Sequence, residues 1–283
     1  MELYPKKLTR RHFLLLAPAV GIAYMFGEAR WLDVGRHEVP LLAKKPSAPV
    51  TLLHLSDFHA SEFVSLDFIA SAVDLALRSC VPDLVCLTGD FITWKWEEWA
   101  RYSEILARLA KRAPTFACLG NHDGGYWAAS SKGYDDHAAV EAMLVSAGVR
   151  LLQNTAAVVT AGDVRLNVVG VGDEWALEMD PAMAFQSVEP ADATILLSHN
   201  PDTKTELLAH RWDLLLCGHT HGGQLDLPII GTPFAPVRDK RYVAGLHRWE
   251  KRWLHVTKGV GNLHGMRFGC RPEVSVLQLL AAL

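Results

Sequence analysis

His219 and His221 are separated by one residue and flanked by glycines, in the stretch Cys217–Gln224 that directly follows the apolar run 214–216. Glycine allows the backbone to turn tightly, so two neutral imidazoles at this place can face neighbouring metal ions. Such a pair supplies only part of a metal site. The remaining ligands must come from elsewhere in the chain.

Four earlier segments share one local pattern, a short apolar run followed by Asp, Asn or His, either directly or after one glycine. These residues are Asp57 and His59 after 50–56, Asp90 after 84–88, Asn121, His122 and Asp123 after 115–119, and His199 after 194–198. In open α/β sheets ligands bind beyond the carboxyl ends of the strands, so we expect the five loops to converge on one site. Carboxylate, amide and imidazole donors together suit Mn²⁺, Fe²⁺ or Zn²⁺ better than calcium.

In this order the motifs resemble those of the calcineurin-like metallophosphoesterase family. They are Asp57-x-His59, Gly89-Asp90, Gly120 to Asp123, His199 and Gly218-His219-Thr220-His221. The run Gly218 to Gln224 and the segment 271–274 are most similar to a bacterial branch of exported or membrane-associated phosphodiesterases. The resemblance implies an α/β fold, a four-layer α/β/β/α sandwich of two mixed sheets.

The resemblance also implies roles for the polar residues. One metal ion would be held by Asp57, His59 and His221, the other by Asn121, His199 and His219, with Asp90 bridging the two. A hydroxide between two such ions would attack a phosphoryl group, and the ions would stabilise the attacking and leaving oxygens. His122 would donate a proton to the leaving oxygen, and Asp123 would orient His122.

Composition narrows the classes of function. The chain has 283 residues with 50% hydrophobic content, enough for one large globular domain. Its formal net charge of -3 gives no general attraction to nucleic acid, and a nuclease is disfavoured because the sequence shows no basic stripe interleaved with aromatic residues. The cysteines Cys86, Cys118 and Cys217 lie inside apolar runs, which predicts buried core residues and neither disulfides nor metal ligands.

The first 29 residues are predicted to be a twin-arginine-type export signal or a membrane anchor. Lys6, Lys7, Arg10 and Arg11 precede the apolar stretch 13–27, and Gly27-Glu28-Ala29 has small residues at a spacing suited to cleavage. Residues 30–49 are predicted to be a linker with an extended piece at 31–42, and residues 50–283 the catalytic domain. An export signal implies contact with the export machinery and a location in the periplasm or on the outer face of the membrane. An uncleaved anchor with the domain inside the cell is the alternative.

Hydrophobic periodicity predicts helices at 66–77, 99–109 and 138–147, alternating with the first motif strands. Beyond Gly148 the pattern favours strands, with a hairpin turn at 161–163 and later strands at 241–246, 253–258 and 274–279. Alternation of strand and helix is typical of the α/β class.

The expected function is hydrolysis of phosphodiester or pyrophosphate bonds in a small-molecule or lipid substrate, near the membrane. Two alternatives remain open: a lipid A enzyme similar to UDP-2,3-diacylglucosamine pyrophosphatases, and a non-catalytic metal-binding envelope protein. Aromatic side chains after two motifs (Trp94, Trp96, Trp99, Tyr126 and Trp127) are expected near the mouth of the site, either as a lipid-contacting wall or as packing beneath loops.

Overall fold

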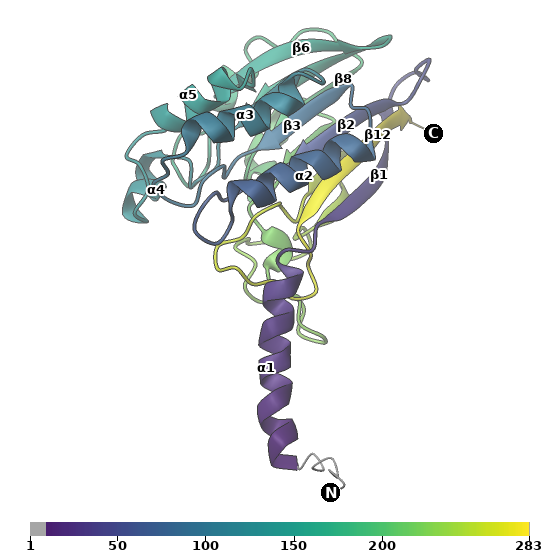
Figure 1. Ribbon diagram of the computed structural model, residues 1–283. Coiled ribbons are helices and arrows are strands. Elements are labelled where there is room, and N and C mark those ends of the chain that lie inside the picture. The colour runs from purple at the N-terminus through teal and green to yellow at the C-terminus, as the bar shows by residue number, and fades with distance from the viewer. Residues whose placement is uncertain (1–9, 283) are drawn as a thin grey trace, which may run out of the picture.

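The computed structural model describes residues 10–282, and two six-stranded sheets form its centre (Figure 1). Lys6 and Lys7 of the expected signal lie outside the described residues. The first sheet has the order β1-β12-β2-β3-β4-β5. Its strands are β1 (Asp33–Leu42), β12 (Glu273–Ala281), β2 (Val50–Leu55), β3 (Leu84–Thr88), β4 (Thr115–Cys118) and β5 (Arg150–Leu151). Only the β12–β2 pair is antiparallel, so the sheet is mixed.

The second sheet has the order β10-β11-β9-β8-β7-β6. Its strands are β6 (Thr155–Ala161), β7 (Val164–Gly170), β8 (Ala193–Leu197), β9 (Leu214–Cys217), β10 (Gly245–Trp249) and β11 (Arg252–Val256). The hairpins β6–β7 and β10–β11 are antiparallel, whereas the four inner strands run parallel. The predicted turn at 161–163 connects β6 to β7 as expected.

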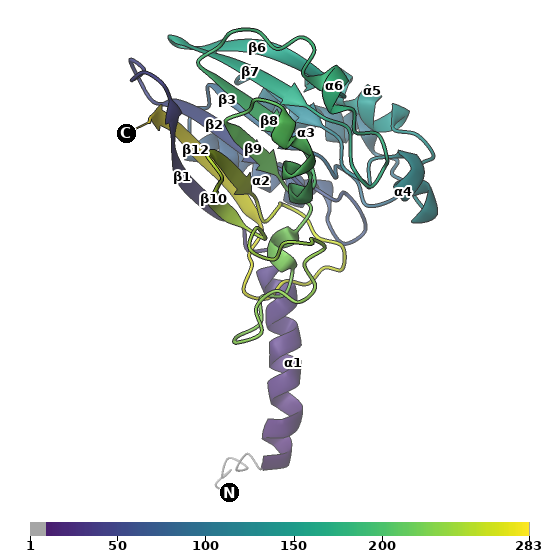
Figure 2. The same cartoon turned by 180° about the vertical axis from the view of Figure 1, so that it is seen from behind.

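Helices cover the outer face of each sheet, so the molecule has four layers. The first sheet is covered by α2 (Leu66–Ser79), α3 (Trp99–Ala110) and α5 (Ala138–Ser146) (Figure 1). Shorter helices lie behind the second sheet: α6 (Pro181–Ala184), η1 (Pro201–Lys204) and η2 (Glu206–Ala209) (Figure 2). The predicted α/β/β/α sandwich is confirmed, with a thinner fourth layer than the first.

The core between the sheets explains why the motif strands carry continuous apolar runs. Leu52, Leu84, Ile195 and Leu214 are fully buried there. A parallel strand covered on both faces has no solvent side, so it shows no alternation of polar and apolar residues. Helix α2 instead carries an apolar stripe on one face and begins at Ser65, whose side chain accepts a hydrogen bond from the Phe68 N–H.

Strand β1 confirms the extended piece predicted at 31–42 and corrects only its assignment to a linker. Asp33 to Leu42 pairs in parallel with β12 over nearly its whole length, and Val39 is buried between the sheets. Pro40 is tolerated because β1 lies at the edge of the sheet, where its missing N–H disrupts no inner pairing. The catalytic domain thus includes a strand that precedes residue 50.

Helix α1 (Arg10–Glu28) extends away from the sheets, yet its last turn is attached to the domain (Figure 1). Met25 O accepts a hydrogen bond from Arg267 N, and Glu28 Oε2 accepts one from Gly269 N. Glu28 and Ala29, at the expected cleavage site, are both 3% exposed. Among the described residues no helix is both long enough and apolar enough to span a bilayer.

The strand predicted at 241–246 lies further along the chain. Tyr242 N donates to Asp239 O in a turn, and Val243 O accepts from the Thr220 hydroxyl, so neither residue joins a ladder. The strand β10 begins at Gly245, whose φ of 94° completes the turn.

Candidate active site

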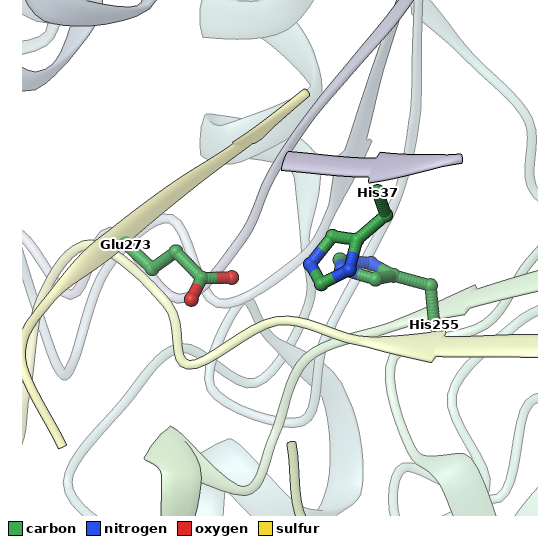
Figure 3. Close-up of side chains that lie close together, drawn as sticks. All are labelled: His37, His255 and Glu273. Carbon is green, nitrogen blue, oxygen red and sulfur yellow. The ribbon is translucent and has the colours of Figure 1, made fainter. Parts of the chain in front are cut away.

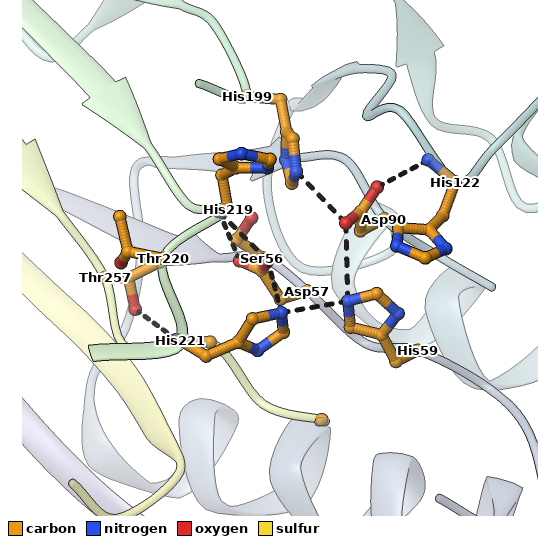
Figure 4. Close-up of polar contacts among 12 residues, drawn as sticks. Ser56, Asp57, His59, Asp90, His122, His199, His219, Thr220, His221 and Thr257 are labelled. Atoms are coloured by element: carbon orange, nitrogen blue, oxygen red, sulfur yellow. Dashed lines mark hydrogen bonds and ion pairs between the residues drawn. The ribbon is translucent and has the colours of Figure 1, made fainter. Parts of the chain in front are cut away.

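Polar side chains from loops after strands of both sheets meet in one cluster (Figure 4). The first sheet contributes Asp57 and His59 after β2, Asp90 after β3, and Asn121, His122 and Asp123 after β4. The second sheet contributes His199 after β8, and His219 and His221 after β9. The structure therefore brings together all nine residues that the sequence singled out, and all are at most 8% exposed.

The backbone around this cluster is strained. Asp57, His59, Asp90, His219 and His221 all have positive φ, between 48° and 67°. Left-handed backbone costs free energy for a residue with a Cβ, and such strain gathers at functional sites. Gly218 permits the close approach of the two sheets, since a Cβ there would lie 2.1 Å from Asp57 Oδ2.

The first group of donor atoms comprises Asp57, His59 and His221. His59 Nε2 lies 3.1 Å from His221 Nε2, and His221 Nε2 lies 3.5 Å from Asp57 Oδ1. All three ligand atoms lie within 4.8 Å of one another. The Asp57 carboxylate is held in place by the His219 N–H at 2.9 Å.

The second group comprises Asp90, His199 and His219, again within 4.8 Å of one another. Asp90 Oδ2 lies 3.1 Å from His199 Nε2 and 3.3 Å from His59 Nε2, so this single oxygen faces both groups. Asn121 is 1% exposed, and its Oδ1 atom has no hydrogen-bond partner. Its amide oxygen is free to complete the second group.

Neighbouring hydrogen bonds fix which imidazole nitrogen carries the proton. His199 Nδ1 lies 2.6 Å from Thr88 O, a carbonyl that can only accept, so Nδ1 is the donor. In a neutral ring the His199 Nε2 lone pair then faces the Asp90 carboxylate. Two acceptors in such contact require a cation or a proton between them, and the buried His219 Nε2 likewise has no hydrogen-bond partner. The arrangement fits divalent metal ions, with the carbonyl acting as the outer partner that orients a ligand.

Burial and charge set the protonation of the ion-free cluster. Burial lowers the pKa of His59 to about 4 and that of His219 to about 3, which leaves both rings neutral. Burial also lowers the pKa of His199, but the carboxylates of Asp90, Asp57 and Asp173 together outweigh burial and raise that pKa above its ordinary value. A metal ion competes with that proton, because histidine binds metal through a neutral nitrogen.

His122 lies beside the two groups, with a ring nitrogen within 4.8 Å of ligand atoms of His59 and Asp90. Its backbone N–H donates to Asp90 Oδ1 at 2.9 Å, and its ring Nδ1 donates to Thr93 O at 2.7 Å. The ring also packs edge-on against Trp127, with centroids 4.4 Å apart. Nδ1 is thus committed to the protein, and Nε2 is the atom left to meet a substrate.

The expectation that Asp123 orients the ring of His122 needs correction. The Asp123 carboxylate accepts hydrogen bonds from the backbone N–H groups of Asp90, Gly120 and Phe91, at 2.6 to 2.8 Å. It thereby ties the loop after β3 to the loop after β4. The ring of His122 is instead oriented by the Thr93 carbonyl, which sequence reasoning did not identify because Thr93 lies in an irregular loop.

A pocket of about 430 Å³ opens above the second group. Asp90, Asn121, His122, His219 and His221 lie at its floor, and its walls include Trp127, Trp175, Leu225, Phe234, Pro236, Leu263 and His264. Trp127 reaches the mouth as predicted. Trp96 and Trp99 instead pack against the helical core, and Trp94 Nε1 donates to Glu62.

Sequence reasoning missed Trp175, which packs edge-on against His219 with centroids 4.4 Å apart. A signal was present, since Trp175 follows Gly172-Asp173 at the carboxyl end of another strand, β7. The Asp173 carboxylate accepts from the Trp175 and Ala176 N–H groups and so shapes this loop. Sequence reasoning also missed Arg267, whose fully buried guanidinium donates to the carbonyls of His221 and Gly259.

Another histidine group lies between the edges of the two sheets, formed by His37, His255 and Glu273 (Figure 3). The Glu273 carboxylate there accepts from Ser275 Oγ at 2.6 Å and lies 3.5 Å from Lys258 Nζ. His255 Nδ1 lies 2.9 Å from His54 Nδ1. Because protein partners already satisfy this carboxylate, we assign the group to packing between the sheets.

Comparisons with known proteins agree with the geometry. The family model described as calcineurin-like phosphoesterase matches residues 50–223. The phosphodiesterase YaeI of Escherichia coli (strain K12) is 40% identical over 280 residues, covering 96% of this chain and 100% of the relative. The UDP-2,3-diacylglucosamine pyrophosphatase LpxG of Chlamydia muridarum is 28% identical, covering 81% and 83%. The metallophosphoesterase YkuE of Bacillus subtilis is 27% identical, covering 97% and 98%.

The matched segment begins at the first residue of β2 and ends just after His221, so it contains every loop that supplies a donor atom. The agreement in both extent and chemistry makes this chain a hydrolase of phosphoesters, and it belongs to the calcineurin-like phosphoesterase family.

Proposed function

We propose that the chain hydrolyses phosphodiester or pyrophosphate bonds with two divalent metal ions, Mn²⁺, Fe²⁺ or Zn²⁺, at the cell envelope. The observation that carries the proposal is the position of Asp90, whose Oδ2 lies 3.3 Å from His59 and 3.1 Å from His199. One carboxylate oxygen between two sets of donors is what a bridging ligand requires.

The proposed ligands are Asp57, His59 and His221 for one ion, Asn121, His199 and His219 for the other, and Asp90 for both. When bound, two such ions would neutralise charge on a phosphoryl group and lower the pKa of a water molecule beside it. The protein holds the donors rigidly, since the Asp57 and Asp123 carboxylates each tie separate loops together through backbone N–H groups. Preorganised donors need little rearrangement during the reaction.

His122 is proposed to act on the leaving group. Its Nδ1–H is held by Thr93 O, so a protonated ring presents Nε2–H to the pocket. Transfer of that proton to the leaving oxygen would prevent an alkoxide from forming, and such general acids commonly contribute about 10²- to 10⁴-fold in rate.

The proposed location at the envelope is supported by the N-terminal residues. Arg10 and Arg11 precede an apolar stretch that holds no charged residue from Phe13 to Gly27. Export through the twin-arginine route would allow the metal ions to bind before translocation. Retention of the helix on the inner face remains the alternative location.

The test compares hydrolysis of bis(p-nitrophenyl) phosphate with that of p-nitrophenyl phosphate by the full chain, with Mn²⁺ and with chelator. We expect metal-dependent turnover of the diester. Turnover of the monoester alone would contradict a phosphodiesterase and indicate a phosphatase.

A second candidate is a lipid pyrophosphatase with the specificity that the name of LpxG describes. The apolar wall of the pocket, with Leu225, Phe234 and Leu263, favours it, because an acylated substrate needs apolar surface near the phosphate. Release of UMP from UDP-2,3-diacylglucosamine by the purified chain would support this candidate. Hydrolysis of the simple diester without cleavage of the lipid would contradict it.

A further inference from the structure

One end of the molecule, which we name the apolar end, exposes large hydrophobic side chains from two separate segments. Helix α1 exposes Val20, Ile22, Tyr24 and Phe26, and the hairpin Leu227–Gly231 exposes Ile229 and Ile230 at its tip. Both segments project from the same end of the sandwich (Figures 1 and 2).

Contacts at their bases join the two segments into one surface. Asp226 N, at the start of the hairpin, donates to Phe268 O, and the Phe268 ring packs edge-on against Tyr24 of α1 with centroids 5.9 Å apart. The neighbouring Arg267 N donates to Met25 O. The orientation of α1 and of the hairpin is therefore set by the same short segment.

The hairpin is poorly suited to water. Ile229 is fully exposed and also has a positive φ of 72°, an unfavourable conformation for a β-branched residue. At the base of the hairpin, Leu227 and Gly231 exchange two backbone hydrogen bonds of 2.8 Å, which close the turn that carries Ile229 and Ile230. Apolar side chains on a projecting turn favour the boundary between head groups and acyl chains of a bilayer, where the apolar surface leaves water and the remaining backbone groups still find polar partners.

Helix α1 points to the same environment. Between Phe13 and Gly27 the sequence has no charged residue, and from Val20 to Phe26 its apolar side chains are exposed around the helix. A helix without a polar face needs apolar contacts on all sides. Lys6, Lys7, Arg10 and Arg11 precede the uncharged stretch 13–27 in the sequence, and basic residues beside an apolar segment attract anionic lipid head groups.

The pocket is continuous with the apolar end. Leu225 and Phe234, which flank the hairpin in the chain, line the pocket, and Phe234 is 67% exposed. A molecule lying in a bilayer at the hairpin would thus meet apolar wall residues before it reached the polar floor.

We propose that the apolar end docks into an anionic phospholipid bilayer through α1 and through Ile229 and Ile230, and that the pocket takes lipid phosphoesters from that surface. The docking is independent of catalysis, whereas the choice of substrate class rests on the proposed function. The buried position of Glu28 and Ala29 agrees with α1 remaining part of the folded protein.

Flotation of the full chain with vesicles of phosphatidylglycerol and phosphatidylethanolamine tests the docking. Three double variants are compared with the wild type: Ile229→Glu with Ile230→Glu, Val20→Glu with Ile22→Glu, and the control Val81→Glu with Val145→Glu, two similarly exposed valines outside the apolar end. We expect the first two to lower the lipid partition coefficient by about tenfold or more, and the control to float as the wild type does. A hairpin variant that partitions like the wild type would overturn the proposal.

Two substrates in the same vesicles separate docking from catalysis. The hairpin variant should hydrolyse soluble bis(p-nitrophenyl) phosphate as the wild type does, and should lose turnover of a p-nitrophenyl phosphodiester that carries an acyl chain. Equal turnover of the acylated diester by both proteins would refute delivery from the bilayer. A wild type that floats but hydrolyses neither diester would contradict the proposed function and leave the docking supported.

Discussion

The floor and the mouth of the pocket are built on different principles. At the floor, Asp90 and Asn121 are each 1% exposed, and the backbone N–H of His122 donates to the Asp90 carboxylate. At the mouth, Phe234 and the adjoining hairpin are exposed and contribute almost only apolar surface. The difference separates reaction from selection: the floor determines which bond can be broken, and the mouth determines which molecules arrive there.

The largest effect is expected from Asp90→Ala, which removes the carboxylate shared by both donor groups and the acceptor for the His122 N–H. Both metal ions should be depleted, and turnover of the diester should fall by at least about a thousandfold. Metal analysis by mass spectrometry beside a hydrolysis assay checks this.

The control for this variant is Asp239→Ala, which removes a carboxylate paired with Arg241 outside the pocket. It should leave metal content and turnover unchanged. Two metal ions retained per chain in Asp90→Ala would remove Asp90 as the shared ligand.

His122→Ala sharpens the distinction within the floor between binding metal and moving protons. Metal content should stay at the wild-type level while kcat falls by about 10²- to 10⁴-fold. His264→Ala is the matched control, because His264 lines the same pocket but makes no contact with Asp90. A parallel loss of metal and activity in His122→Ala would make His122 a ligand rather than an acid.

The residues of the floor were predictable because their types, Asp, Asn and His, are metal ligands and proton donors that rarely follow buried apolar runs. The chain repeats this pattern five times, and such a repetition indicates that the five loops form a common site. Asp123 shows the limit of such a pattern, since its residue type was recognised but its partners depend on how two loops fold together.

Most of the mouth was not predictable, for a physical reason. Phe234 and Leu263 are ordinary apolar residues in loops, and only the tertiary structure places them beside the floor. The extended piece at 31–42 was predicted, but its place in the sheet was missed for a similar reason, because its partner β12 lies more than 200 residues later and local sequence carries no record of that pairing.

His54, which lies between the sheets, predicts how the stability of the metal-free protein depends on pH. His54 is buried between the sheets and donates or accepts at Thr88 Oγ1, and burial lowers its pKa to about 3. The unfolded chain takes up a proton near the ordinary pKa of about 6.5, whereas the folded chain does not. Stability of the metal-free protein should therefore decrease as pH falls below that value, by about 1.4 kcal/mol per pH unit for this histidine.

Urea denaturation at pH 7, 6 and 5 in chelator measures the slope for the wild type and for His54→Gln. In the variant, the free energy of unfolding should change less steeply with pH, because the unfolded chain takes up one proton fewer. Identical slopes would show that His54 does not remain neutral in the folded state.

The smallest effect is expected at the mouth, from Phe234→Ala. Because Phe234 offers apolar surface without touching the polar floor, its loss should raise KM for bis(p-nitrophenyl) phosphate by about two- to tenfold and leave kcat unchanged. Tyr126→Ala is the control: Tyr126 is exposed to a similar extent, 72%, but lies outside the pocket lining. If Phe234→Ala instead lowered kcat at constant KM, the mouth would take part in the reaction itself, and the division between selection at the mouth and chemistry at the floor would fail.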